Sequence, residues 1–295
     1  MAAKTESIVE RESHFIQTNG VTLHVVQAGP KDGELVILLH GFPEFWYGWR
    51  RQIDALAKAG FRVWAPDQRG YNLSEKPAGI ASYHLDLLAK DVIGLIDAAG
   101  RETACIAGHD WGAGVTWHTA LKYPSRLRKI GILNVPHPAV MSRTLRSSAA
   151  QMLKSWYMFY FQIPVLPELM VGMGDSAAAA QQLLRSSRPG TFTDADIAEY
   201  LKAWRHPGAW TAMINWYRSV AQNNPKLPED IRVKVPTLMI WGAKDAFLSE
   251  AMAQPSIDLC DEGRLVKFAE ATHWVQHEES YQVSALLAEW FAPQK

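Results

Sequence analysis

The chain has 295 residues, of which 48% are hydrophobic, and it carries 30 basic and 30 acidic side chains. A chain of this length can bury a large core, and its zero net charge provides no overall field that would attract nucleic acid or an anionic membrane. Seven Lys or Arg and no Asp or Glu lie between Trp111 and Pro167, which we interpret as a solvated basic face rather than a nucleic-acid site.

The cysteine content and the N-terminal sequence indicate the cellular compartment in which the protein resides. Cys105 and Cys260 are the two cysteines, and neither belongs to a C-x-x-C pattern, which favours a reducing environment without a disulfide framework. The first fifteen residues are charged and lack an apolar stretch typical of a signal peptide. No apolar run is long enough to span a bilayer. We therefore expect a cytoplasmic protein.

Strand and helix signals alternate through the first half of the chain. Asn19-Gly20 is a hairpin turn signal, and short apolar runs such as Leu35–Leu39 are typical of strands buried on both faces. Because helical segments separate these runs, the pattern predicts a parallel, doubly wound sheet. We expect strands at 14–18, 21–28, 35–39, 61–65, 103–107 and 127–133, with helices near 47–59, 83–98 and 112–123.

The pattern changes after the sixth strand, because residues 138–222 contain no convincing strand signal. An all-helical insertion in a parallel-sheet domain predicts a lid over the site. We therefore expect a core of residues 1–137 and 223–295 and a helical cap of 138–222. Within the cap the sequence predicts helices at 144–161, 176–184, 194–204 and 208–222, and after it strands at 235–241 and 264–268 and a helix near 279–291.

Gly108-His-Asp-Trp-Gly112 lies between a predicted buried strand and a predicted helix. It has the spacing of the G-x-S-x-G nucleophile elbow, with Asp110 in place of serine. The glycines allow a sharp turn, and the start of the following helix favours negative charge at this point. The alternative is an aspartate that only caps the helix.

An aspartate nucleophile points to displacement at saturated carbon. A serine that attacked an sp³ carbon would form an ether, which water does not readily cleave. Asp110 would form an ester instead, whose carbonyl belongs to the protein and which water can hydrolyse to restore the carboxylate.

The partners of the nucleophile are expected in the order acid and then histidine. Asp245 follows the strand predicted at 235–241, and His273 follows the last predicted strand, so both should reach the same sheet edge. Asp245 would orient the imidazole of His273, which would act as a base. His277 is four residues further on, but no third ligand is nearby in sequence, so we expect a structural role for it and neither a metal nor a cofactor.

His40-Gly-Phe-Pro43 ends the predicted strand 35–39. A glycine there allows a turn that directs the backbone N–H of Phe42 to the site. With the N–H of Trp111 it would form an oxyanion hole for the intermediate produced when water attacks the Asp110 ester. A plain strand-to-loop turn is the alternative.

Four motifs together resemble the epoxide hydrolases of the α/β-hydrolase superfamily. The motifs are His40-Gly-Phe-Pro-Glu-Phe-Trp46, Asp67-Gln-Arg-Gly-Tyr-Asn-Leu-Ser74, Gly108-His-Asp-Trp-Gly112 and Asn215-Trp-Tyr-Arg218, and the match runs from about residue 12 to 292. The resemblance implies the α/β-hydrolase fold and conversion of a small apolar epoxide and water to a vicinal diol.

The resemblance also implies two cap tyrosines that polarise the epoxide oxygen. One corresponds to Tyr217 and the other to Tyr157, with Tyr160, one helical turn further along the same face, as the alternative. Either tyrosine could instead be an ordinary lid residue with a satisfied hydroxyl group. We expect the substrate pocket to include His40, His137, Trp156, Met158, Phe159 and Tyr160.

Two other functions remain open at this point. A haloalkane dehalogenase would use the same Asp110, Asp245 and His273, but such enzymes often have asparagine where this chain has Phe42. Fluoroacetate dehalogenases carry arginines where this chain has Trp111 and Gly114, so an anionic substrate is disfavoured. A hydrolase-fold receptor that binds a ligand without turnover would not need the complete catalytic set.

Overall fold

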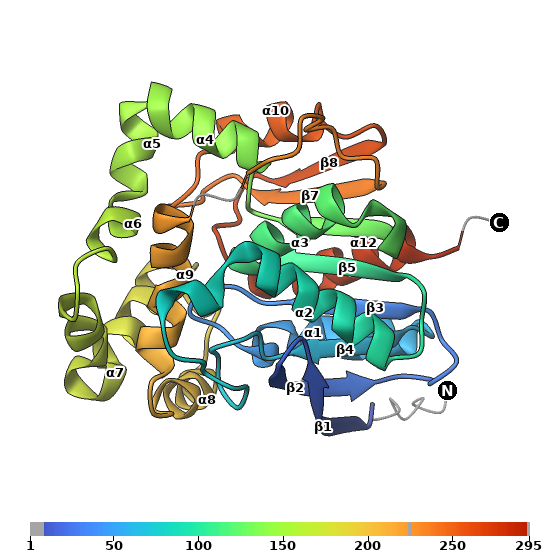
Figure 1. Cartoon of the computed structure of the whole chain (residues 1–295), viewed down its shortest axis with the longest axis horizontal. Coiled ribbons are helices and arrows are strands. Elements are labelled where there is room, and N and C mark those ends of the chain that lie inside the picture. The colour runs from blue at the N-terminus through green and yellow to red at the C-terminus, as the bar shows by residue number, and fades with distance from the viewer. Residues whose placement is uncertain (1–8, 224–225, 294–295) are drawn as a thin grey trace.

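The protein, described here from a computed structural model that covers residues 9–223 and 226–293, is built on one eight-stranded sheet (Figure 1). The strand order is β1-β2-β4-β3-β5-β6-β7-β8. β1 and β2 are antiparallel to their neighbours, and the pairs from β4 through β8 are parallel. The strands are β1 (Arg11–Thr18), β2 (Val21–Ala28), β3 (Leu35–Leu39), β4 (Arg62–Pro66), β5 (Ala104–His109), β6 (Leu127–Leu133), β7 (Thr237–Gly242) and β8 (Gly263–Phe268).

This sheet confirms the predicted mostly parallel, doubly wound architecture, with small shifts in strand bounds. β7 begins at Thr237 rather than at residue 235, because Pro236 has no N–H to donate to the sheet. The expectation that the chain has no signal peptide depends largely on residues 1–8. These residues lie outside the described part of the chain.

Helices cover both faces of the sheet. α2 (Leu85–Ala98) and α3 (Trp111–Lys122) pack together on one face, and α1 (Arg50–Lys58) packs with α12 (Ser280–Phe291) on the other. Successive side chains of a strand point to opposite faces. Ile37 of β3 accordingly joins the core under α2 and α3, whereas Leu38 joins the core under α1 and α12. The continuous apolar run of β3 follows from this burial on both faces.

A helical insertion lies between β6 and β7, at the end of the sheet where the parallel strands finish (Figure 1). It consists of α4 (Pro138–Ser147), α5 (Ala149–Lys154), α6 (Trp156–Tyr160), α7 (Leu166–Ser186), α8 (Asp194–Trp204) and α9 (Ala209–Gln222). The remaining short elements are η1 (Trp46–Trp49), η2 (Ile80–Tyr83), η3 (Pro124–Arg126), η4 (Glu250–Met252), α10 (Ala253–Ile257) and α11 (Val275–Glu278).

The single helix predicted at 144–161 is wrong, because three short helices occupy this part of the insertion. Ser148 has an extended backbone and caps the start of α5 through its hydroxyl group, which accepts from the N–H of Gln151. Serine favours such caps over helix interiors. Ser155 lies between α5 and α6, at the residue that precedes the start of α6. α7 is likewise interrupted, with non-helical backbone angles at residues 173–176.

Within the part of the chain that the structure describes, every helix falls short of the length and apolar character that a membrane crossing would require.

Candidate active site

Asp110 lies in the tight turn between β5 and α3, with φ +49° and ψ −123°. Two glycines make this turn possible. A Cβ at Gly112 would lie 2.0 Å from the carbonyl oxygen of Leu39, and a Cβ at Gly41 would lie 2.2 Å from the Cβ of Asp110. The carboxylate makes no capping hydrogen bond to α3. The strained backbone therefore presents the side chain to the site and not to the helix.

A backbone N–H binds one oxygen of this carboxylate. Phe42, in the loop after β3, donates its N–H to Asp110 Oδ1 over 2.7 Å. Trp111 is the first residue of α3, a position whose N–H has no acceptor within the helix. Binding of Oδ1 by Phe42 leaves Oδ2 as the oxygen nearer to the histidine.

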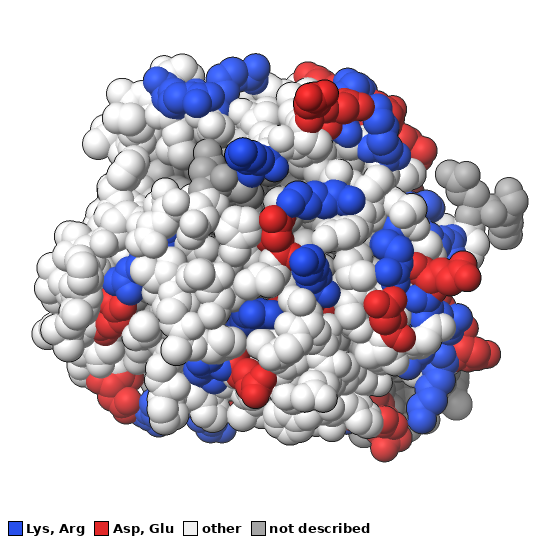
Figure 2. Space-filling view, viewed as in Figure 1, with Lys and Arg blue, Asp and Glu red and all other residues white. Residues whose placement is uncertain are grey.

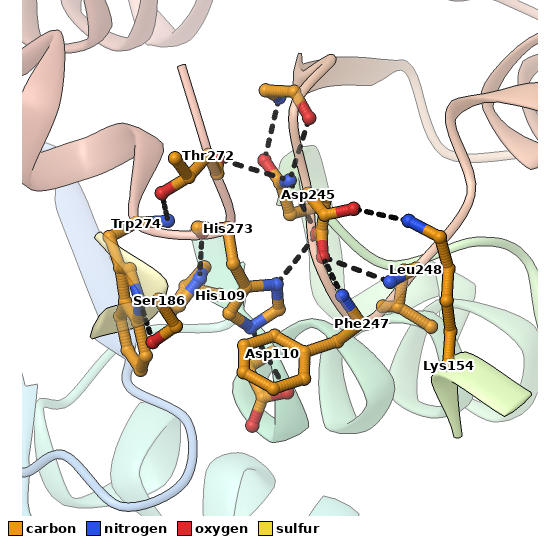
Figure 3. Close-up of polar contacts among 12 residues, drawn as sticks. His109, Asp110, Lys154, Ser186, Asp245, Phe247, Leu248, Thr272, His273 and Trp274 are labelled. Atoms are coloured by element: carbon orange, nitrogen blue, oxygen red, sulfur yellow. Dashed lines mark hydrogen bonds and ion pairs between the residues drawn. The ribbon is translucent and has the colours of Figure 1, made fainter. Parts of the chain in front are cut away.

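His273 lies between the two predicted carboxylates (Figure 3). Its Nε2 is 3.4 Å from Asp110 Oδ2, and its Nδ1–H donates to Asp245 Oδ2 over 2.7 Å. The backbone N–H groups of Phe247 and Leu248 donate to the other oxygen of Asp245 over 2.7 and 2.9 Å. The structure therefore brings together Asp110, Asp245 and His273, which lie on three separate loops and which the sequence analysis had identified.

Asn134, which the sequence did not single out, holds Asp245 from the neighbouring loop. It follows β6 with a left-handed φ of +53°, and its Nδ2 donates to Asp245 Oδ2 over 2.8 Å. Its Oδ1 accepts from the N–H of Gly242. The loop after β6 has no carboxylate, but it supplies an amide that orients the carboxylate from the next strand. Its position directly after a parallel strand was the available signal.

The charges of the three residues depend on one another. Burial raises the pKa of Asp110, but the hydrogen bond and positive charge of His273 outweigh burial and lower it. Burial likewise opposes ionisation of Asp245, whose pKa His273 also lowers. Burial lowers the pKa of His273, but Asp245 and Asp110 together raise it above its ordinary value. At neutral pH the resting site therefore holds two carboxylates around an imidazolium.

Removing the charge of Asp110 should therefore increase the fraction of His273 that is neutral at neutral pH. We expect Asp110→Asn to lower the pKa of His273, because the variant loses one of the two carboxylates that raise it. An NMR titration of the imidazole resonances, assigned with His273→Gln, measures this change. Asp86→Asn is the matched control, because Asp86 contacts His118 and not His273. An unchanged or higher pKa in Asp110→Asn would contradict the coupling.

A second buried network lies behind His273. His109 donates its Nε2–H to the carbonyl oxygen of His273 over 2.8 Å, and its other ring nitrogen lies 3.2 Å from Glu44 Oε2. Glu44 also accepts from Tyr200 of α8 and contacts His277 over 2.6 Å. His277 thus belongs to a buried polar network joining the insertion to the core. No group of side chains suited to holding a metal ion occurs among residues 9–223 and 226–293.

Two tyrosines of the insertion face Asp110. The rings of Tyr157 in α6 and Tyr217 in α9 are 5.9 Å apart, and Tyr217 packs on Phe42 and Trp111. Burial raises the pKa of both hydroxyl groups, and the negative charge of Asp110 raises them further, so both are neutral donors. Tyr160 packs on Trp156 instead. This placement favours Tyr157 over Tyr160 as the partner of Tyr217.

A cavity of about 500 Å³ opens beside these side chains. That volume is in the range of small-molecule sites. Most of its lining is apolar, and it extends from Asp110 along α3 to His118 and outward to α4. The lining residues are Leu85, Asp110, Trp111, Gly114, His118, Val135, Pro136, Pro138, Met141, Ser142, Leu145, Tyr157, Met158, Tyr217, Val220, Lys226, Leu227 and Leu248.

Of the six residues expected in the pocket, only Met158 lines this cavity. The prediction is wrong for the other five, which lie elsewhere. Trp156 and Phe159 are 61% and 62% exposed on the outer side of α6, and Tyr160 packs against Trp156. His40 is fully buried beneath the site, where its Nε2 accepts from the N–H of Gln68. His137 is buried against Trp117 and caps the start of α4.

Comparison with known proteins gives the following similarities. A family model described as alpha/beta hydrolase fold matches residues 34–280. The chain is 46% identical over 280 residues to the AB hydrolase superfamily protein YfhM of Bacillus subtilis, covering 95% of this chain and 98% of that protein. It is 33% identical to epoxide hydrolase A of Mycobacterium tuberculosis, covering 98% of both chains. The structure of a Bacillus megaterium epoxide hydrolase in complex with an inhibitor matches with a TM-score of 0.87 and 31% identity, covering 94% of this chain and 99% of that one.

Proposed function

Because this chain belongs to the alpha/beta hydrolase family and is related to its epoxide hydrolases, we propose that it hydrolyses epoxides to vicinal diols through an ester of Asp110. The observation that carries the proposal is the nucleophile itself. A carboxylate, not a hydroxyl group, occupies the elbow, 3.4 Å from the Nε2 of a histidine that is held by a second carboxylate. That arrangement suits displacement at a saturated carbon followed by hydrolysis of the resulting ester.

In the first step, Asp110 Oδ2 attacks one epoxide carbon while Oδ1 stays bound to the N–H of Phe42. The C–O bond of the strained ring breaks, and its oxygen takes a proton from Tyr157 or Tyr217. Two neutral hydroxyl groups from side chains that line the same cavity as Asp110 support this role. The tyrosinate regains its proton from the imidazolium of His273, directly or through solvent. The product of the step is therefore an ester between Asp110 and the opened substrate, beside a neutral His273.

In the second step, a water molecule attacks the ester carbon of Asp110. His273 takes the proton of this water at Nε2, and Asp245 stabilises the imidazolium that forms. Ester formation has already removed the charge of Asp110, one of the two charges that raise the pKa of His273. The pKa of His273 is therefore lower at this stage than in the resting site, and the neutral imidazole is available to accept a proton. The N–H groups of Phe42 and Trp111 bind the oxyanion, and as it collapses the ester C–O bond breaks. The released diol oxygen takes the proton from Nε2 of His273, and the carboxyl group of Asp110 then gives its own proton to Nε2, which restores the resting site.

We also propose that residues 138–222 act as a cap over the core formed by 1–137 and 223–295. The insertion supplies Tyr157, Met158 and Tyr217 to the cavity, whereas the core supplies Asp110. The mostly apolar lining favours a small apolar epoxide.

The experiment that tests this function compares matched substrates. Aryl and alkyl epoxides should yield diols, and the corresponding chloroalkanes should release little or no chloride, because the paired tyrosines assist a leaving group that needs a proton. The products are identified by mass spectrometry and chloride by ion chromatography. Rapid chloride release with every epoxide untouched would instead support a dehalogenase. Recovery of all ligands unchanged after prolonged incubation would support a receptor.

A further inference from the structure

An exposed apolar surface covers the outer side of the insertion. Of the fourteen large hydrophobic side chains that are exposed among the described residues, ten lie between residues 152 and 173. Such a concentration marks an interaction surface, because exposed apolar side chains in a monomer are normally scattered. We call this surface the insertion patch, and its members are Met152, Leu153, Trp156, Phe159, Ile163, Val165, Leu166, Leu169, Met170 and Met173.

The insertion patch lies next to positive charge. The side of the molecule formed by α5, α6 and α7 is mostly uncharged, and Lys and Arg side chains gather at its upper edge (Figure 2). Arg143 and Arg146 of α4 are exposed and make no ion pair with any residue that the structure describes. Between residues 138 and 173 the one carboxylate is Glu168, which is paired with Arg218. The patch therefore presents apolar side chains next to Arg143 and Arg146, and the one carboxylate in this segment, Glu168, is already paired.

We propose that the insertion patch docks on the surface of an anionic phospholipid bilayer. Apolar side chains beside exposed arginines form the pattern of interfacial membrane binding, in which the apolar groups enter the acyl boundary and the cations contact anionic headgroups. The aromatic side chains Trp156 and Phe159, both members of the patch, favour this interface. Local charge acts within a Debye length of the membrane, so the zero net charge of the chain does not oppose binding.

The charge pattern favours lipid over a second copy of the chain. A symmetric dimer brings the same patch of two copies together, so its cations need anions within that patch. Arg143 and Arg146 would face a surface whose one carboxylate, Glu168, is already paired. An anionic bilayer supplies the missing negative charge.

The helices that carry the patch also form walls of the cavity. Tyr157 and Met158 of α6 line it, while Trp156 of the same helix lies on the outside, and the neighbouring α4 contributes Pro138, Met141 and Leu145. If the proposed epoxide hydrolysis holds, an apolar substrate dissolved in the bilayer would enter close to the membrane surface. Binding to the bilayer itself does not depend on that activity.

The test is flotation with vesicles of phosphatidylcholine, with and without 30% phosphatidylglycerol. We expect the full-length protein to float with the anionic vesicles at low salt, and to do so much less with neutral vesicles or in high salt. Leu153→Ser with Leu169→Ser, and separately Arg143→Glu with Arg146→Glu, should each reduce binding at least tenfold. Matched controls outside the patch are Phe15→Ser with Tyr281→Ser, and Lys58→Glu with Lys90→Glu, which should float like the parent.

Three outcomes would overturn the inference. The parent protein could stay in solution with anionic vesicles. It could bind neutral and anionic vesicles equally, with the arginine variant unaffected. It could form a dimer that the Leu153→Ser and Leu169→Ser variant breaks, without binding lipid, in which case a second copy is the partner. Circular dichroism of each variant confirms folding, and failure of epoxide turnover leaves this result unaffected because flotation requires no catalysis.

Discussion

Exchanging His273 for Gln is expected to lower steady-state epoxide turnover by about 10⁴-fold while leaving the first chemical step in place. Asp110 loses the favourable charge of His273 but keeps the hydrogen bond from Phe42, which also favours its ionised form, so it can still be alkylated. Without a base at position 273, water does not attack the ester efficiently. The ester should therefore accumulate, and the intact mass of the protein should increase by the full mass of the epoxide.

Peptide mapping of this variant locates the added mass, which should lie on the peptide that contains Asp110. His206→Gln is a matched control, because His206 lies outside the site, and it should turn over at the parent rate without a stable adduct. An inactive His273→Gln that never gains mass would exclude the two-step scheme. An adduct on a peptide without Asp110 would assign the nucleophile elsewhere.

Removing both hydroxyl groups of Tyr157 and Tyr217 is expected to slow ester formation by at least a thousandfold. An alkoxide is a poor leaving group, and a positioned general acid contributes about a hundred- to ten-thousandfold in rate. Because both tyrosines line the same cavity, the hydroxyl group that remains after a single Tyr→Phe change should partly compensate for the one that is lost. The rate of ester formation is measured by rapid quench before steady state.

Tyr160→Phe is the matched control for this pair, since Tyr160 packs against Trp156 and is not among the residues that line the cavity. It should form the ester at the parent rate. A double variant that opens epoxides as fast as the parent would remove these two tyrosines from the mechanism. A large loss in Tyr160→Phe alone would transfer the role of Tyr157 to that residue.

The residues that sequence reasoning located best are those whose placement depends on local structure. Asp110 could be located because glycines at fixed spacing allow one sharp turn between a strand and a helix. Asp245 and His273 could be located because each follows a parallel strand, and such strand ends meet at one edge of the sheet. Chain order and strand position were sufficient to bring them together.

The outward direction of Trp156 and Phe159 could not be derived in the same way. A single helix over 144–161 would fix the direction of every side chain by its period. The breaks at Ser148 and Ser155 restart that period, so the face that α6 turns to the cavity depends on how short helices pack. We predicted that Trp156 and Phe159 line the pocket only because they are hydrophobic, but they form part of an exposed surface.

The supporting polar residues depend on contacts between distant segments. Asn134 reaches Asp245 across 111 positions, and His109 reaches the carbonyl of His273 across 164 positions. Nothing local distinguishes Asn134 from any other polar residue after a strand. Buried polar groups require partners, but the sequence does not specify which distant residue provides them.

The most direct test of the account is the origin of the new oxygen in the diol. The parent protein, in excess over an epoxide, completes one turnover in water labelled with oxygen-18, and the diol and the peptide containing Asp110 are analysed by mass spectrometry. We expect the diol of this first turnover to carry unlabelled oxygen from Asp110, and the label to appear in the Asp110 carboxylate. Labelled diol with an unlabelled Asp110 would show that water attacks the epoxide directly and would contradict the ester mechanism.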